Sequence, residues 1–245
     1  VVLQILARRG IRVAAHIRSI AGIQDVPFDP VCCGFDQFAA LVGKGFPVLD
    51  DEAGLAMQAA IGGARAAQDS VGGVVECACV GLPAGVGAPM FDGIENVVAK
   101  LLFGIPAVKG VEFGAGFAVA DMYGSQNNDP IVLDEAGHAT CRTNNAGGIL
   151  GGISTGMPVI VRAAFKPTPS IAEEQSTIDI VDGCETRLSV PGRHDPCVVV
   201  RAVPVVEAAM ALAVIDCLAS DGVLGPVNDS AVDPQVLERT RTLFG

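Results

Sequence analysis

The most informative stretch of the chain is Gly192-Arg193-His194-Asp195-Pro196-Cys197, which leads into Val198-Val199-Val200. A guanidinium, an imidazole and a carboxylate stand on three successive residues, and Pro196 keeps the residue before it out of a helix. The apolar run behind them predicts a buried strand, and polar side chains at the end of a buried element are held in place, as a site requires. The alternative is an Asp-Pro turn with solvated charges, which the turn rules favour for these six residues alone.

The composition allows one large core, because half of the 245 residues are hydrophobic. The formal net charge of −11 argues against nucleic acid as a partner, because nucleic-acid-binding proteins carry a basic surface. The longest apolar stretch, Val205 to Leu218, is interrupted by Glu207 and Asp216 and is shorter than the roughly 18 residues of a membrane span. We therefore expect a single domain over residues 1–245 that binds neither nucleic acid nor a membrane.

The chain has eight cysteines and three histidines, and none of the cysteines forms a Cys-x-x-Cys pair, so we predict no metal site. Cys77 and Cys79 would lie on one face of a strand, where reduced cysteine serves as a small apolar residue. Disulfides are the alternative that the even count leaves open. No secretion signal is visible, and we expect a cytoplasmic protein. Val1 to Arg9 is typical of the middle of a helix, from which we expect further sequence upstream.

Apolar periodicity predicts groups of short strands and a few long helices, which is typical of an α+β fold rather than of strict βα alternation. The predicted strands cover residues 11–20, 74–80, 131–133 and 159–165, and a hairpin joins residues 177–181 to 185–190. The predicted helices cover residues 50–68, with Asp50 as N-cap, residues 94–103, and residues 204–219, with Pro204 in the first position. We expect a polar loop over residues 124–130 and a poorly packed tail from Asp221.

Two details of these elements are predicted separately. His16 falls on the polar face of the first strand, so we expect a surface histidine. Leu55, Ala59 and Gly62-Gly63 place small residues on one face of the first long helix, which would let another helix approach closely.

Two further stretches have the composition of ligand-binding loops. Residues 142–156 contain five glycines and two asparagines, so their backbone can lie against a ligand, although a bare glycine run is more often structural. This run is neither a Walker loop nor a Gly-x-Gly-x-x-Gly fingerprint. The strand over residues 159–165 leads into Lys166-Pro167-Thr168-Pro169-Ser170, whose lysine and two hydroxyls suit an anion. A rigid exposed turn is the alternative for that segment.

Taken together, these stretches resemble the chorismate synthase family. The resemblance lies in several motifs that occur in the family's order: Asp69–Gly73, Gly87–Phe91, Ile105–Phe113, Gly124-Ser125 with Asn128-Asp129, Arg142–Gly156, Lys166–Ser170 and Arg193–Glu207. They cover most of residues 69–218.

The resemblance implies a β-α-β sandwich, in which a helical layer lies between antiparallel sheets, and a homotetramer. It implies the 1,4-elimination of phosphate from 5-enolpyruvylshikimate 3-phosphate to give chorismate, in the shikimate pathway of aromatic amino acid biosynthesis. The reaction requires reduced FMN although it is redox-neutral overall. The resemblance leaves open whether NADPH reduces the flavin on the enzyme or reduced flavin is supplied from elsewhere.

The resemblance also assigns residues. It implies that the flavin is lined by Pro106, Ala107, Gly151, Lys166, Pro167, Thr168, Pro169, Ser170 and Arg193. Asp195 is similar to the acidic residue beside the flavin that assists proton loss. These residue types suit the chemistry, because Lys166 and hydroxyls can bind the flavin phosphate and Arg193 can bind the anionic groups of the substrate. A carboxylate close to the flavin can relay a proton.

The sequence departs from the family pattern in one large respect. It lacks the family's N-terminal third, with its Gly-Glu-Ser-His-Gly motif, its Arg-Ala-Ser-Ala-Arg segment, several substrate-binding arginines and both acid–base histidines. His16, His138 and His194 do not match those histidines. We therefore interpret residues 1–245 as the C-terminal two-thirds of a chorismate synthase and expect them to be inactive alone. The alternative is a catalytically silent anion-binding or assembly fragment, whereas a nicotinamide dehydrogenase would need a Rossmann fingerprint.

Overall fold

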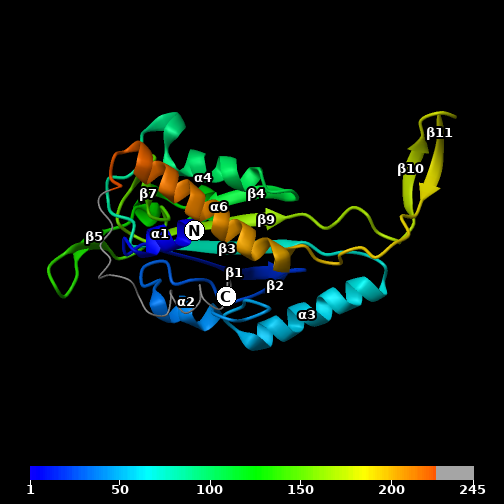
Figure 1. Cartoon of the computed structure of the whole chain (residues 1–245), viewed down its shortest axis with the longest axis horizontal. Coiled ribbons are helices and arrows are strands. Elements are labelled where there is room, and N and C mark those ends of the chain that lie inside the picture. The colour runs from blue at the N-terminus through cyan, green and yellow to red at the C-terminus, as the bar shows by residue number, and fades with distance from the viewer. Residues whose placement is uncertain (225–245) are drawn as a thin grey trace.

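The computed structural model describes residues 1–224, and its central feature is a five-stranded antiparallel sheet (Figure 1). The strand order is β2-β1-β3-β9-β4. The strands are β1 (Arg12–Ile20), β2 (Ile23–Gln24), β3 (Gly73–Val80), β4 (Val108–Phe113) and β9 (Val159–Phe165). Because β9 pairs with both β3 and β4, segments far apart in the sequence meet at the centre of the sheet. The strands predicted from alternating hydrophobicity are confirmed.

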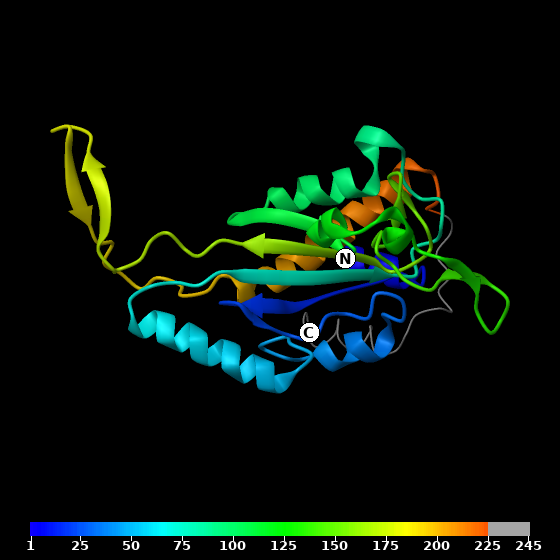
Figure 2. The same cartoon turned by 180° about the vertical axis from the view of Figure 1, so that it is seen from behind.

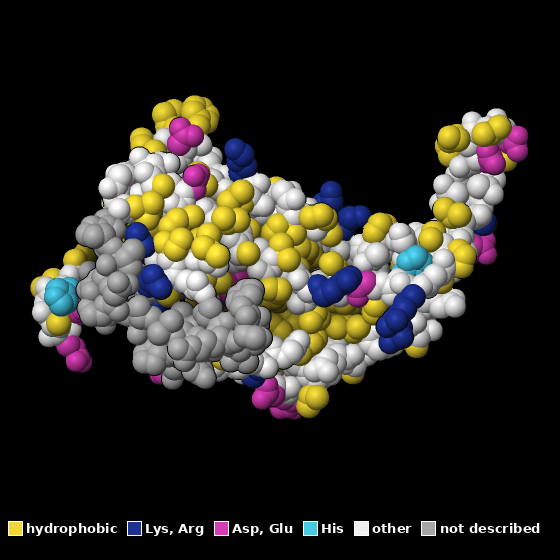
Figure 3. Space-filling model, viewed as in Figure 1, with side chains coloured by type: hydrophobic (Ala, Val, Ile, Leu, Met, Phe, Trp, Pro, Cys, Tyr) yellow, Lys and Arg dark blue, Asp and Glu magenta, His cyan; other side chains and the backbone are white. Residues whose placement is uncertain are grey.

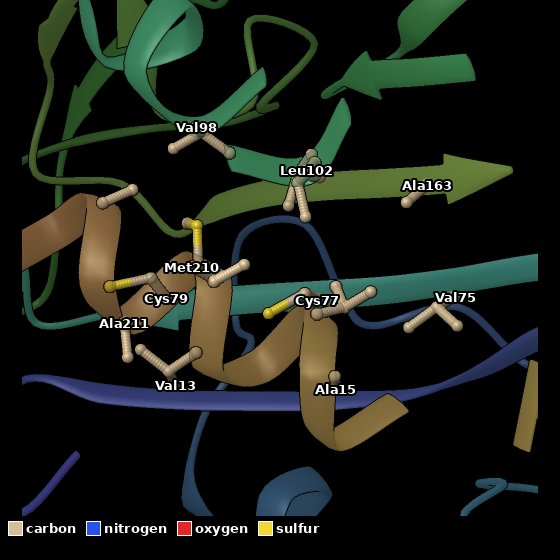
Figure 4. Packing of buried hydrophobic residues seen from close by; sticks show 14 of the residues in the cluster. Val13, Ala15, Val75, Cys77, Cys79, Val98, Leu102, Ala163, Met210 and Ala211 are labelled. Carbon is tan, nitrogen blue, oxygen red and sulfur yellow. The ribbon is translucent and has the colours of Figure 1, made fainter. Parts of the chain in front are cut away.

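One face of the sheet carries small apolar side chains that line up across the strands. Cys77 lies opposite Ala15 of β1 and Val161 of β9. Figure 4 shows this face of the sheet packing against Met210 and Ala211 of one helix and against Val98 and Leu102 of another; these two helices are described next. Cys77 and Cys79 are free and fully buried, as predicted, and burial raises the pKa of the Cys79 thiol to about 12.

Helix α6 (Val199–Ser220) lies across this apolar face. The prediction of a strand at residues 198–200 is wrong, because α6 begins at Val199, whose side chain is buried in the core. Pro204 therefore lies inside the helix rather than at its first position. A run of three buried apolar residues is compatible with either a strand or a helix, and periodicity alone could not separate the two.

The composition of α6 is apolar enough for a membrane span, with a mean hydropathy of 2.0 over its most apolar window. However, 56% of that window is buried inside the protein, as in the core helix of a globular domain. The outer side of α6 exposes Val205 and Leu212. Figure 3 shows hydrophobic side chains spread over this helical face of the molecule.

Two further helices complete this layer. Helix α4 (Ile94–Phe103) buries Ile94, Val98 and Leu102 at helical spacing, which confirms the prediction for this segment. Helix α1 (Val2–Ala7) buries Leu6 and Ala7 and packs against α6 and β1. The antiparallel sheet and the helical layer confirm the α+β class.

The opposite face of the sheet is partly covered by α2 (Phe35–Leu41), whereas α3 (Asp51–Ala66) packs beside β1 and β2 and buries Met57 in the main core. A smaller apolar cluster there joins Phe28, Phe38 and Leu41 to small side chains of the sheet. The N-cap prediction for α3 is confirmed, since the Asp50 carboxylate accepts a hydrogen bond of 2.9 Å from the amide of Glu52. The small-residue face is not covered by a second helix within residues 1–224, because no atom lies within 4 Å of a side chain at Gly62 or Gly63.

His16 is fully buried, so the prediction of a surface histidine is wrong. It lies on the polar face of β1, as its register requires, but the segment that follows β2 covers this part of the sheet. Burial is tolerated because both ring nitrogens face carboxylates, those of Asp25 and Glu76.

The connections carry the remaining short elements of the described chain. These are η1 (Met90–Asp92), η2 (Gly116–Asp121), α5 (Gly124–Asn127), β5 (Ile131–Leu133), β6 (Ala139–Cys141), β7 (Ile149–Leu150) and β8 (Ile153–Ser154). The predicted strand at residues 131–133 is confirmed, whereas the segment expected as a loop at 124–130 contains one turn of helix. The predicted hairpin is formed by β10 (Gln175–Asp179) and β11 (Cys184–Leu188), which project from the body of the molecule (Figure 2). Most of the predicted loose tail, residues 225–245, lies outside the described residues.

Candidate functional site

A pocket of about 970 Å³ lies at the end of the sheet from which the β10–β11 hairpin projects. Three segments form its walls: the end of α3 with the residues after it, the segment after β9, and the segment that leads into α6. The lining residues are Arg65, Gln68, Asp69, Ser70, Thr168, Ser170, Ile171, Ala172, Gly192, Arg193, His194, Asp195, Pro196 and Arg201.

Backbone hydrogen bonds hold these three walls together. The hydroxyl of Ser70 donates to the carbonyl of Thr168 at 2.7 Å, and the amide of Val71 donates to the carbonyl of Pro196 at 2.8 Å. The carbonyl of Gln68 accepts from the amides of Ala172 and Glu173 at 3.1 and 3.2 Å. The pocket therefore has a preformed frame that does not depend on a ligand.

Asp195 lies just before the first turn of α6. One carboxylate oxygen accepts the amide of Cys197 at 3.2 Å, and the other forms an ion pair with the guanidinium of Arg201. Arg201 belongs to the first turn of α6, so the helix itself carries the partner that orients the carboxylate. The Asp195 side chain is 28% exposed, so it remains accessible from the pocket.

His194 and Gly192 shape the same segment. The Nε2 of His194 lies 2.7 Å from the carbonyl of Val190, which makes this nitrogen the donor and fixes the ring orientation. Gly192 has φ +152°, and a Cβ at this position would come within 3.3 Å of the His194 ring. The bend that presents Arg193 to the pocket therefore favours glycine here.

Arg193 and Arg65 are the cations of the pocket that have no carboxylate partner within residues 1–224. Arg201 is partly neutralised by Asp195. A pocket with two unpaired guanidinium groups and the hydroxyls of Thr168 and Ser170 is suited to an anionic ligand.

Four of the predicted site residues line this pocket: Thr168, Ser170, Arg193 and Asp195. Pro167 and Pro169 belong to the same segment but do not line it, and neither does Lys166. The amide of Lys166 donates to the carbonyl of Ala107 at 2.9 Å, which places Pro106-Ala107 beside this segment.

Ala107 has φ +73°, and Gln68 has φ +61°. Both values are uncommon for residues with a Cβ and cost on the order of 1–3 kcal/mol each. Both residues also supply a carbonyl that holds the segment after β9, at Lys166 and Ala172. Two of the four non-glycine residues with positive φ in the described chain thus hold this segment.

Gly151 lies apart from the other predicted residues. Its neighbour Gly152 accepts the amide of Ile94 at the start of α4, whereas Pro106 and Ala107 follow the end of that helix. A ten-residue helix is about 15 Å long, so Gly151 lies near one end of α4 and Pro106-Ala107 near the other, and Gly151 does not line the pocket.

Several lining residues were not assigned a role from the sequence, and three of them carry long polar side chains: Arg65, Gln68 and Arg201. Arg201 belongs to a quoted motif, but its partner six residues earlier became visible only with the helix start at Val199. In the sequence, Arg65 and Gln68 stand at the end of the helix predicted over residues 50–68. No local pattern indicates that this end faces residues about 100 positions later.

The family model for chorismate synthase matches residues 1–219. The chain belongs to the chorismate synthase family. Among similar curated proteins, the chorismate synthase of Methanocella arvoryzae is 45% identical over 232 residues, which are 94% of this chain and 60% of that protein. The chorismate synthase of Archaeoglobus fulgidus is 56% identical over 156 residues, 64% of this chain and 43% of that protein.

A solved structure of chorismate synthase matches with a TM-score of 0.72 and 25% identity, over 97% of this chain and 64% of the other. The fold expected from the resemblance is therefore confirmed for the part of the family's length that this chain covers. The chain spans about 60% of the length of several of the curated chorismate synthases that it matches.

Proposed function

We propose that this chain is part of an enzyme that converts 5-enolpyruvylshikimate 3-phosphate to chorismate and phosphate by 1,4-elimination, with reduced FMN. The observation that carries the proposal is the pocket itself. It brings Arg193, Asp195, Thr168 and Ser170, which the family resemblance assigns to the flavin site, into one lining. These residues come from two segments that are separated by more than 20 positions in the chain, so their convergence is a property of the fold.

The pocket suits FMN in size and in chemistry. Its volume of about 970 Å³ lies at the upper end of the usual range for ligand pockets. Arg193 and Arg65 can pair with a phosphate, and the hydroxyls of Thr168 and Ser170 can donate to its oxygens. Lys166, Pro106 and Ala107 lie beside the pocket and are proposed to complete the flavin site. Gly151 lies apart from the pocket, so its proposed contact with the flavin would be made from another side of the site.

Reduced FMN, when bound, supplies the electron chemistry of the elimination. The residues of this chain bind and orient the reactants and move a proton. Two unpaired guanidinium groups favour a substrate that carries a phosphate and two carboxylates. Asp195, held by Arg201 and the amide of Cys197, is positioned to accept the proton that is lost as the phosphate leaves.

Further parts of the proposal follow from the family. The enzyme is a homotetramer that acts in the cytoplasm, where the eight free cysteines of the chain stay reduced. Either NADPH reduces the flavin on the enzyme or reduced flavin is supplied from elsewhere. The alternative is a catalytically silent anion-binding or assembly unit. Such a unit would have the same pocket but would not convert the substrate.

A chimera tests this function against the alternative. Residues 1–219 would replace the matching segment of the Methanocella arvoryzae chorismate synthase, which supplies the rest of the family length. Under anaerobic conditions with excess reduced FMN and substrate, we expect equal release of phosphate and chorismate. A folded chimera that binds FMN but releases neither product would contradict the enzymatic role and support the silent unit.

A further inference from the structure

His16 is the centre of a buried ionic cluster on the sheet face opposite α6. Its Nδ1 lies 2.9 Å from a carboxylate oxygen of Asp25, and its Nε2 lies 3.0 Å from one of Glu76. All three side chains are at most 3% exposed. We name these three residues the His16 clamp.

Both carboxylates of the clamp also accept backbone amides. Asp25 accepts the amides of Leu49 and Asp50 at 2.7 and 2.8 Å, and Glu76 accepts the amide of Phe28 at 2.7 Å. An ionised carboxylate only accepts hydrogen bonds, whereas an imidazolium donates from both ring nitrogens. The arrangement of His16 between two carboxyl groups that already accept amides therefore favours its imidazolium form.

Other charged groups surround the clamp from each neighbouring strand. Arg162 of β9 lies 3.4 Å from Glu76 and 2.6 Å from Glu112 of β4, so Glu76 has a second cationic partner. At the start of α3, Asp51 pairs with Lys44 at 2.6 Å. Burial alone would lower the pKa of His16, but its hydrogen bonds to Asp25 and Glu76 outweigh burial and raise that pKa.

The clamp holds the beginning of α3. Asp50, the N-cap of α3, is bound through its amide to Asp25, which in turn is bound to His16. Gly54 and Met57 are the buried residues of this helix, and a Cβ at Gly54 would come within 2.7 Å of Val48. Beyond Met57 every residue of α3 is half-buried or exposed, so the helix is anchored mainly at its first half.

The other end of α3 forms a wall of the candidate site. Arg65 lies in its last turn, and Gln68 follows it; both line the pocket. The carbonyl of Gln68 also holds the amides of Ala172 and Glu173. A helix of 16 residues is about 24 Å long, so α3 connects the clamp to the pocket over this distance, along the β1 and β2 side of the sheet (Figures 1 and 2).

We propose that His16 is a positioning residue for the candidate site, acting through α3. As an imidazolium it holds the first turn of α3 to the sheet; loss of its proton releases that turn and loosens the Arg65 and Gln68 wall of the pocket. A neutral imidazole has a single N–H, so one buried carboxylate loses its donor, which is costly without solvent. The statement that this pocket binds a ligand rests on the proposed function. The predicted loosening of α3 when His16 loses its proton does not.

The direction of the pH dependence follows from the raised pKa of His16. The contribution of the clamp is complete below the ordinary histidine pKa of about 6.5 and is lost as the pH rises through the higher folded value. The pocket wall should therefore be firm below about pH 6.5 and loosen as the pH rises through the raised pKa of His16.

The wild-type polypeptide provides the first test. Nitrogen NMR of the histidine rings reports the protonation of His16, and amide hydrogen exchange, corrected for its intrinsic pH dependence, reports protection of α3 and of Ala172 and Glu173. We expect a doubly protonated His16 at pH 7. Above its pKa, protection of both regions should fall by up to about tenfold per pH unit, the limit for one proton. A neutral His16 at pH 7, or unchanged protection at Ala172 and Glu173 through its titration, would overturn the proposal.

Variants supply the second test. His16→Gln can donate to only one carboxylate at a time and does not titrate, so protection of α3 should be low at pH 7 and independent of pH. His138→Gln is the matched control, because the His138 side chain is 80% exposed and lies 3.4 Å from Asp134, away from α3. Equal protection in both variants would contradict the role of His16. A failure of FMN to bind any of these proteins would count against the proposed function and leave the exchange result intact.

Discussion

Asp195 shows how much of this site depends on single contacts. The carboxylate is fixed on one side by the amide of Cys197, just before α6, and on the other by Arg201 in the first turn of α6. These two partners hold the carboxylate in one orientation, so less conformational entropy is lost when it reaches a productive geometry. Three consecutive polar residues, Arg193 to Asp195, thus differ in their contacts: the first lines the pocket, the second binds the carbonyl of Val190 and the third is a candidate base.

Replacing Asp195 by Asn should impair turnover more than binding. In the chimera described above, Asp195→Asn keeps the shape and the amide contact but removes the proton acceptor, so we expect kcat to fall by about 10²–10⁴-fold. The affinity for FMN should stay within a few-fold of wild type, the pattern of a group that acts in the transition state. Stopped-flow measurement of chorismate formation under anaerobic conditions checks this. Turnover near wild type would remove Asp195 from the catalytic assignment.

Arg193 should recognise a phosphate. Arg193→Met removes a cation that no carboxylate of the described chain neutralises, so FMN should lose affinity more than riboflavin, which lacks the phosphate. Lys166→Met should show the same preference to a smaller extent, because Lys166 lies beside the pocket rather than in its lining. Fluorescence titration with both flavins measures the ratio. Arg187→Met, on the projecting hairpin where Arg187 faces Glu174, is the control; equal loss for both flavins in Arg193→Met would exclude the phosphate contact.

At the scale of elements, α6 does the most to hold the domain together. Its inner side buries Val199, Val206, Met210 and Val214 against β1, β3 and α4, and its first turn carries Arg201 into the pocket. The same helix thus joins the core to the site. Displacement of its first turn would move both Arg201 and the segment from Gly192 to Cys197.

Truncation of the inner face of α6 should be far more costly than truncation of its outer face. Met210 is fully buried, so Met210→Ala should lower the free energy of unfolding by about 2–5 kcal/mol. Leu212 lies two residues away and is 49% exposed, and Leu212→Ala should cost less than about 1 kcal/mol. Urea denaturation of the 245-residue polypeptide compares the two. Similar losses would mean that the outer side of α6 is buried in solution, as in a complex with another polypeptide.

At the scale of the whole molecule, the described chain supplies one side of the proposed flavin site and the sheet and helices behind it. Of its three histidines, His16 is enclosed in the clamp and His138 lies on the exposed β5–β6 turn. His194 alone lines the pocket, and its Nε2 is occupied by a backbone carbonyl. The elimination needs more proton-transferring and anion-binding groups than this set provides.

The 245-residue polypeptide alone should therefore not form chorismate at a useful rate. A missing general acid or base costs on the order of 10²–10⁴ in rate, and a poorly held polyanionic substrate costs more. The measurement is an anaerobic assay with excess reduced FMN, beside the chimera as a positive control for the reagents. Turnover of the polypeptide comparable to that of the chimera would show that His194 and the arginines of this pocket suffice.

The sequence by itself determined the strands at residues 11–20, 74–80 and 159–165, the helices at residues 50–68 and 94–103, and the family. Each of these rests on local information: an alternating or helical apolar period, a cap such as Asp50, or a motif whose residues are adjacent. It also placed Arg193 and Asp195 in a site, because both stand in one motif.

Only the tertiary structure decided three things: that α6 begins at Val199, that His16 is buried between two carboxyl groups, and that Arg65 and Gln68 face the pocket. Each depends on a partner that is distant in the chain or on burial that a short apolar run does not specify. Glu76 lies 60 residues from His16, and the segment held by Gln68 begins about 100 residues further along. A charged side chain is stable inside a protein only beside such partners, and their distance in the sequence leaves no local pattern from which they could be predicted.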